Sequence, residues 1–100
     1  MFFEYRQNNS GGAMDIDDAR GIGRIVVIEA HDAKDADRRA EEAGLYFDGI
    51  EAGTDCECCG DRWYRASGWY EDQGICDPRE TGDPAGAWVH YMDGRTEWNA

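Results

Sequence analysis

The sequence predicts an α+β fold: a single domain over residues 1–100 in which one helix packs on a mostly antiparallel sheet of four or five strands. Three observations support this prediction. Runs of aromatic and β-branched residues near the N-terminus are typical of strands, an alanine-rich segment after them has helical spacing, and the C-terminal residues have the pattern of a β-hairpin. A loop that carries cysteines lies between the helix and the hairpin.

The composition predicts an ordered protein that does not span a membrane. Lys and Arg number 10 against 22 Asp and Glu, which gives a formal net charge of -12. Leu, Ile, Val and Phe are scarce, but four Trp and five Tyr, each able to bury roughly 150–250 Å², supply material for a core. No stretch of the chain approaches the ~20 consecutive apolar residues that a membrane-spanning helix needs.

Two strands are predicted in the N-terminal third of the chain. Residues 2–7 form the first, and the turn-forming residues 8–12 end it. Residues 13–23 are polar and loop-like. Residues 24–30 form a nearly continuous β-branched run, which is typical of a central strand covered on both faces. We expect the two strands to pair as a hairpin across the long loop.

The best helix signal covers residues 32–43. Asp32 is a suitable N-cap, and Gly44 can adopt the left-handed conformation that ends a helix. The apolar face consists of small residues spaced three or four apart, which lets the helix lie close to a sheet: Ala33, Ala36, Ala40 and Ala43.

Two short strands and two loops are expected after the helix. Residues 45–50 and 62–66 are predicted as the third and fourth strands. Between them, residues 51–60 form the cysteine loop. Residues 71–86 are rich in Gly, Asp and Pro, which indicates an irregular loop.

Residues 88–98 predict a C-terminal hairpin. Its strands flank the dipeptide Asp93-Gly94, and the positive φ angles of a two-residue hairpin turn suit Asp and Gly. Such a turn fixes the register of the strands. The predicted opposing pairs are Tyr91 with Thr96, His90 with Glu97, and Val89 with Trp98.

The most specific motif is a pair of cysteines, Cys56 and Cys59, with the C-x-x-C spacing of a zinc knuckle. A closed tetrahedral zinc site needs two more ligands, and the candidates are Cys76 and His90. A zinc ribbon would have its fourth Cys where Arg79 stands, however, and His90 is already explained as a cross-strand partner in the hairpin. Reduced thiols with no cofactor are therefore the favoured interpretation, and a zinc site is the alternative.

Four aromatic residues after the cysteine loop allow two interpretations: Trp63, Tyr64, Trp69 and Tyr70. They could form an exposed interaction surface, because Trp and Tyr are favoured at protein interfaces. The chain has a single Leu, however, so aromatic rings must fill much of its interior. The second interpretation, that these residues belong to the core, is favoured.

No catalytic motif stands out in the sequence, and we expect no enzymatic activity. The two serines, Ser10 and Ser67, have no recognisable partnership with His31 or His90. The charge argues against direct nucleic-acid binding, which depends on Lys and Arg. The N-terminal residues lack the features of a signal peptide, so a cytoplasmic protein with no membrane partner is expected.

The segments 46–49 and 55–63 resemble small uncharacterised proteins encoded by tailed bacteriophages. The second segment carries the pattern D-C-x-C-C-G-x-R-W. The resemblance implies expression in the cytoplasm of an infected bacterium and an accessory role, such as modulating a host protein. It brings no established activity with it.

The leading functional hypothesis is a non-enzymatic phage accessory protein that binds and modulates a host or phage protein through an acidic, aromatic-bearing surface. A second hypothesis is an acidic mimic of nucleic acid, whose spaced carboxylates inhibit a DNA-binding or defence enzyme. A third is a small enzyme or nucleotide-binding protein with a pocket near the cysteine loop or residues 71–86. The sequence leaves the oligomeric state open.

Overall fold

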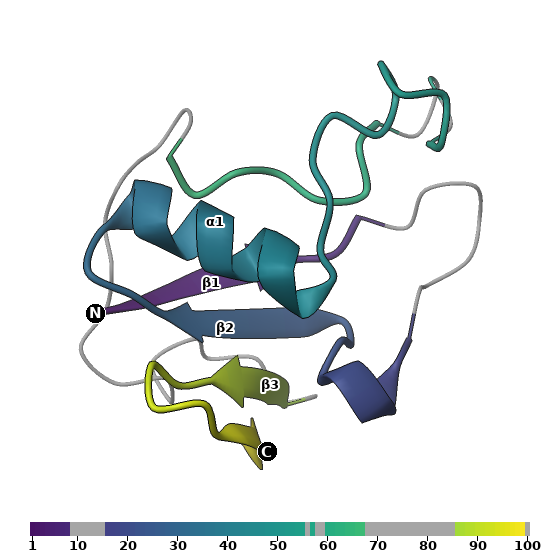
Figure 1. The fold of residues 1–100 in the computed structure, drawn as a ribbon. Coiled ribbons are helices and arrows are strands. Elements are labelled where there is room, and N and C mark those ends of the chain that lie inside the picture. The colour runs from purple at the N-terminus through teal and green to yellow at the C-terminus, as the bar shows by residue number, and fades with distance from the viewer. Residues whose placement is uncertain (9–15, 56, 58–59, 68–85, 100) are drawn as a thin grey trace.

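The computed structural model describes residues 1–8, 16–55, 57, 60–67 and 86–99. One helix packs against a four-stranded mixed sheet, which confirms the predicted α+β class (Figure 1). The elements in chain order are β1 (Phe2–Arg6), the 3-10 helix η2 (Asp18–Arg20), β2 (Ile25–Glu29), α1 (Ala33–Ala43), β3 (Ala87–His90) and β4 (Thr96–Asn99). In this described part, no helix is long and apolar enough to cross a membrane.

The strands lie in the order β1-β2-β3-β4. β1 pairs antiparallel with β2, from Phe2 opposite Glu29 to Arg6 opposite Ile25, so the hairpin expected across the long loop is confirmed. β2 and β3 are parallel, whereas β3 and β4 are antiparallel. A parallel pair requires a crossover connection, and α1 lies in that connection.

β2 is the buried centre of the sheet, as its β-branched sequence predicts. Its first four residues, Ile25 to Ile28, are each at most 1% exposed. Val26 and Ile28 face α1, and Ile25 and Val27 belong to a smaller cluster on the opposite face with Val89. Both faces of this strand are therefore covered.

α1 begins and ends where its sequence predicts. The Asp32 side chain accepts a hydrogen bond of 2.8 Å from the Asp35 backbone N–H, and Gly44 ends the helix with a φ of 116°. Figure 1 shows the helix lying over β1 and β2, with β3 on the side of β2 away from β1. The core beneath the helix consists of Phe3, Tyr5, Ile22, Val26, Ile28, Ala30, Ala33, Ala36, Ala40, Leu45 and Trp63.

The strands predicted at residues 45–50 and 62–66 are wrong, because neither segment joins the sheet. The first turns sharply: the Gly49 carbonyl accepts hydrogen bonds from the N–H groups of Thr54 and Asp55. Both segments nevertheless place a side chain in the core, Leu45 from the first and Trp63 from the second. The apolar residues that suggested strands are anchors for a loop.

The C-terminal hairpin is present, but its register differs by one residue from the prediction. The Tyr91 N–H donates to the Arg95 carbonyl over 2.8 Å, so three residues form the loop instead of the two of an Asp-Gly turn. Gly94 takes the left-handed conformation in this loop, with a φ of 96°. The observed pairs are His90 with Thr96, Val89 with Glu97, Trp88 with Trp98, and Ala87 with Asn99.

Candidate functional site

The carboxylate of Asp55 organises the loop that carries the cysteine motif. Its side chain is 1% exposed and accepts hydrogen bonds from the Tyr46 hydroxyl at 2.8 Å and the Arg62 backbone N–H at 2.9 Å. The Arg62 Nε lies 4.0 Å from Asp55 Oδ1 and donates to the Tyr46 oxygen over 3.0 Å. Burial, followed by the hydrogen bond to Asp55, raises the pKa of the Tyr46 hydroxyl.

This cluster is tied to the end of β1. The Arg62 guanidinium donates to Gln7 Oε1 over 2.7 Å, and Gln7 Nε2 donates to the Gly23 carbonyl over 3.0 Å. The Asn8 N–H donates to the Arg62 carbonyl over 2.8 Å. Arg62 of the motif thus holds this segment against the end of β1, through both its side chain and its backbone carbonyl.

Two glycines, Gly49 before the motif and Gly60 within it, are required by the geometry of the loop. A Cβ atom on Gly49 would lie 1.8 Å from Asp55 Oδ2, so no larger residue fits beside the buried carboxylate. Gly60 has a φ of 90°, and a Cβ atom there would lie 2.8 Å from the Tyr64 hydroxyl. Asp55, Gly60 and Arg62 of the motif therefore have structural roles.

The predicted metal ligands are brought together only in part by the described structure. Cys56, Cys59 and Cys76 lie outside the described residues. His90 is half-buried on β3, with its Nε2 2.8 Å from the Gly21 carbonyl oxygen and its Nδ1 3.5 Å from the Thr96 hydroxyl. Among the residues that the structure describes, no three His, Cys, Asp or Glu side chains gather as a metal site. Reduced thiols therefore stay the prediction, and a zinc site stays the alternative hypothesis.

A second buried carboxylate, Asp37 on α1, joins the helix to the segment after the motif. It is 6% exposed and accepts hydrogen bonds of 2.7 Å from the Tyr5 hydroxyl and from the Ala66 N–H. The Ser67 N–H and hydroxyl donate to its other oxygen. Burial, followed by the hydrogen bond to Asp37, raises the pKa of Tyr5.

The sequence reasoning missed the Asp37 cluster, although one signal was available. Asp37 lies four residues after Ala33 and three before Ala40, so helical spacing places it beside the alanine stripe. A carboxylate in that position must find hydrogen-bond donors inside the protein. Ser67, considered above only as a nucleophile, is one of these donors.

The structure describes two of the four aromatic residues considered for an interaction surface, and these two lie in different environments. Trp63 is 1% exposed and belongs to the core, as the favoured interpretation predicts, so it is not part of an exposed interaction surface. Its ring fills the space beneath the helix that a chain with one Leu leaves open. Tyr64 is 56% exposed, whereas Trp69 and Tyr70 lie outside the described residues.

A different pair of aromatic side chains is exposed, on the C-terminal hairpin. Trp98 on β4 is 51% exposed, and its ring centre lies 5.4 Å from that of Trp88, in an edge-on arrangement. The Trp88 indole N–H donates to Asp18 Oδ1 over 3.3 Å, which fixes the inner ring. The sequence analysis missed this pair because the predicted register placed Val89, not Trp88, opposite Trp98.

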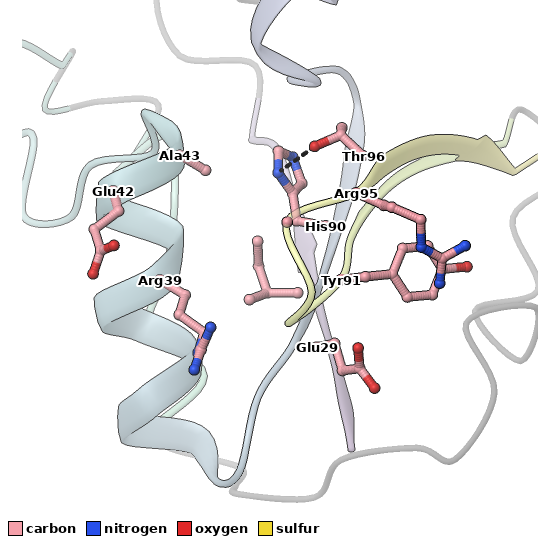
Figure 2. Close-up of a pocket in the computed structure, with 10 residues that line it drawn as sticks. Glu29, Arg39, Glu42, Ala43, His90, Tyr91, Arg95 and Thr96 are labelled. Atoms are coloured by element: carbon pink, nitrogen blue, oxygen red, sulfur yellow. Dashed lines mark hydrogen bonds between the residues drawn. The ribbon is translucent and has the colours of Figure 1, made fainter.

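A shallow groove of about 390 Å³ lies between α1 and the tip of this hairpin. Its lining includes Ile28, Arg39, His90, Arg95 and Thr96. Figure 2 shows His90 and Thr96 facing one another and the Arg95 side chain beside the ring of Tyr91. The lining arginines already carry acidic partners: Arg39 pairs with Asp35, and Arg95 pairs with Asp93 and Glu97.

Comparison with known proteins gives one match. The model of a family described as a domain of unknown function (DUF7296) matches residues 1–99. No curated protein and no solved structure matches the chain.

Proposed function

The chain belongs to the DUF7296 family of domains of unknown function, and we propose that it is a non-enzymatic accessory protein that binds and modulates another protein. We name its binding region the hairpin surface. It is the outer edge of the C-terminal hairpin, with Trp88 and Trp98 on the α1 side of the sheet, Glu97 on the other side, and Met92 and Asp93 in the loop. The resemblance of the segment 55–63 to phage proteins supports a role in an infected bacterial cell, with a host or phage protein as the partner.

The observation that carries this proposal is the half-exposed Trp98 beside a fixed Trp88. Large aromatic side chains dominate the binding energy of protein interfaces, and Trp is the most enriched among them. The edge-on contact with Trp88 restricts the Trp98 ring before any partner arrives. A ring that is already ordered loses little conformational entropy on binding, which favours affinity.

Charge indicates the chemistry of the partner. The chain carries a net charge of -12, and the arginine nearest Trp98 in sequence, Arg95, is bound by the carboxylates of Asp93 and Glu97. Two carboxylates therefore stand against one guanidinium at the hairpin, within a chain that is acidic as a whole. A protein with a basic surface would be attracted and steered toward it.

The experiment is affinity capture from an infected bacterial lysate with three forms of the protein: wild type, Trp98→Ala and Tyr64→Ala. Tyr64→Ala is the matched control because it removes an exposed ring of the cysteine-loop side of the molecule. We expect wild type and Tyr64→Ala to retain the same protein, and Trp98→Ala to lose at least about tenfold in affinity for it. Equal retention by Trp98→Ala, with its circular dichroism unchanged, would contradict the proposal.

A further inference from the structure

We propose that the partner contributes an extended basic segment that adds to the sheet as a fifth strand along the outer edge of β4. This inference rests on the proposed function and names the way in which the hairpin surface is used. Main-chain hydrogen bonds of an added strand give affinity, and side chains at alternate positions give specificity.

β4 is an edge strand with an accessible outer side. Within the described part of the chain it pairs with β3 alone, and it lies at the end of the sheet beside the C-terminus (Figure 1). Thr96, Glu97 and Trp98 are all exposed. An edge of this kind presents backbone N–H and C=O groups that can pair with another chain.

The hairpin register shows which backbone groups face outward. The Tyr91 N–H bonds to the Arg95 carbonyl, so Tyr91 and Arg95 form a hydrogen-bonded pair. Such pairs alternate along an antiparallel ladder, which makes Glu97 the next residue bonded to β3. The backbone groups of Thr96 and Trp98 therefore point away from β3. They are two residues apart, about 7 Å, which is the spacing that an added strand requires.

The side chains of β4 set the sequence of the added strand. Trp98 lies opposite Trp88 on the α1 side of the sheet, and Glu97 lies opposite Val89 on the other side. An apolar side chain or an Arg would pack beside the Trp98 ring. A Lys or Arg would be favoured beside Glu97, because Glu97 shares its partner Arg95 with Asp93. The preferred segment thus alternates basic and apolar residues.

A second copy of this chain is a poor occupant of the same edge. Two copies each carry a net charge of -12 and repel one another. In the two-fold antiparallel pairing that uses the outward groups of both Thr96 and Trp98, Glu97 would stand directly opposite the same residue of the other copy. Like charges in that position are destabilising.

The probe is a fluorescently labelled seven-residue peptide with alternating basic and valine residues, Lys-Val-Arg-Val-Lys-Val-Arg. Two further peptides of this sequence have alternate backbone nitrogens methylated, one on the basic residues and one on the valines. An added strand points one set of N–H groups toward β4 and the other away. We expect one methylated peptide to lose at least about tenfold in affinity and the other to bind within about threefold of the parent.

Two variants test the edge from the protein side. Thr96→Pro removes an outward N–H and places a ring on the edge, a substitution that edge strands tolerate, whereas Thr96→Val keeps the N–H. We expect Thr96→Pro to weaken binding of the parent peptide at least about tenfold and Thr96→Val to change it less than about threefold. Hydrogen exchange at the amides of Thr96 and Trp98 should slow when the peptide binds.

Three results would overturn the inference: no binding of the parent peptide, equal affinities of both methylated peptides and the parent, or unchanged exchange at both amides. The methylated peptides leave the protein unaltered, so they decide the matter even if Thr96→Pro does not fold. If Trp98→Ala loses binding of the cellular partner but folded Thr96→Pro retains it, the result contradicts strand addition and supports the proposed function. A wild-type dimer that Thr96→Pro dissociates would overturn the choice of occupant.

Discussion

Replacing Tyr5 with phenylalanine removes one hydroxyl from the buried Asp37 cluster while keeping the aromatic ring. Tyr5 is 2% exposed, and its hydroxyl donates to Asp37 Oδ1 over 2.7 Å. Hydrogen bonds to charged groups contribute about 1.5–3 kcal/mol to stability. Asp37 keeps the donors of Ala66 and Ser67 in the variant, so we expect the free energy of unfolding near neutral pH to fall by about that amount.

The same variant predicts a change in the pH dependence of stability. Burial and the hydrogen bond to Asp37 raise the pKa of Tyr5 in the folded state above the value of about 10 in the unfolded chain. Above that pH the unfolded state loses the proton and the folded state keeps it, so stability falls as pH rises. The contribution of Tyr5 is complete below about pH 10 and decreases by about 1.4 kcal/mol by about pH 11.

Tyr5→Phe has no hydroxyl to ionise at this position and escapes that alkaline loss. We therefore expect the difference in unfolding free energy between wild type and Tyr5→Phe to shrink by about 1.4 kcal/mol between about pH 9 and about pH 11. Tyr46 also has a raised pKa, but it is present in both proteins and cancels from the difference.

Urea denaturation followed by circular dichroism measures both effects, provided that the dependence of the free energy on urea is the same in the two proteins. Tyr64→Phe is the control, since Tyr64 is 56% exposed, and it should stay within about 0.5 kcal/mol of wild type. A neutral-pH loss below about 0.5 kcal/mol for Tyr5→Phe, or a loss that does not change with pH, would refute the account of this cluster.

Three further predictions concern the loop, the helix and the cysteines. Asp55→Ala should destabilise the protein in urea denaturation by at least about 1–3 kcal/mol, because the Tyr46 hydroxyl and the Arg62 N–H lose a buried acceptor; a change within about 0.5 kcal/mol would contradict this role. Ala36→Trp should lower the free energy of unfolding by about 1–3 kcal/mol, because it overpacks a fully buried site, and Lys34→Trp on the exposed face should lower it less. Equal urea denaturation midpoints for the two variants would refute close packing of the alanine stripe. Elemental analysis of protein never exposed to chelator should find less than about 0.2 zinc per chain, and a stoichiometric zinc that is needed for stability would overturn the expectation of free thiols.

Local signals in the sequence were enough to predict the helix and the long hairpin. Asp32 and Gly44 mark the ends of α1 by their own chemistry, whatever the rest of the chain does. β1 and β2 were recognisable because each is a run of strand-forming residues long enough to be distinguished from a loop. Their antiparallel pairing followed from adjacency in sequence.

The hairpin register could not be decided by turn chemistry. The dipeptide Asp93-Gly94 suits a two-residue turn and equally a three-residue loop with glycine in the left-handed position. The observed register places the rings of Trp88 and Trp98 edge-on to one another. It also places His90 opposite Thr96, where the backbone of Gly21 packs so closely that a Cβ atom there would lie 2.5 Å from the Thr96 methyl group. The contact with Gly21 comes from a distant part of the chain, which turn chemistry does not include.

The candidate sites were harder to predict than the fold. Helical spacing places Asp37 beside the alanine stripe, but its donor Ala66 comes from a segment 29 residues away. Asp55 likewise depends on the fold of its loop, which brings the Arg62 N–H to its carboxylate. The contact of the exposed Trp98 with Trp88 could not be predicted, because it depends on the register of the C-terminal hairpin. The spacing of the cysteines suggested a metal site. The structure shows that Asp55 and Asp61, beside them in sequence, accept hydrogen bonds that stabilise the loop.

The most direct test of partner binding through the acidic, aromatic hairpin surface is the rate of association with the captured partner at two salt concentrations. Raising salt from about 50 to about 500 mM shortens the Debye length from roughly 14 to 4 Å. We expect the association rate to fall by at least about tenfold, because electrostatic attraction steers the partner toward the protein. The dissociation rate should change by less than about threefold, because the Trp98 ring, buried in the complex, limits release. An association rate that does not respond to salt would contradict the account.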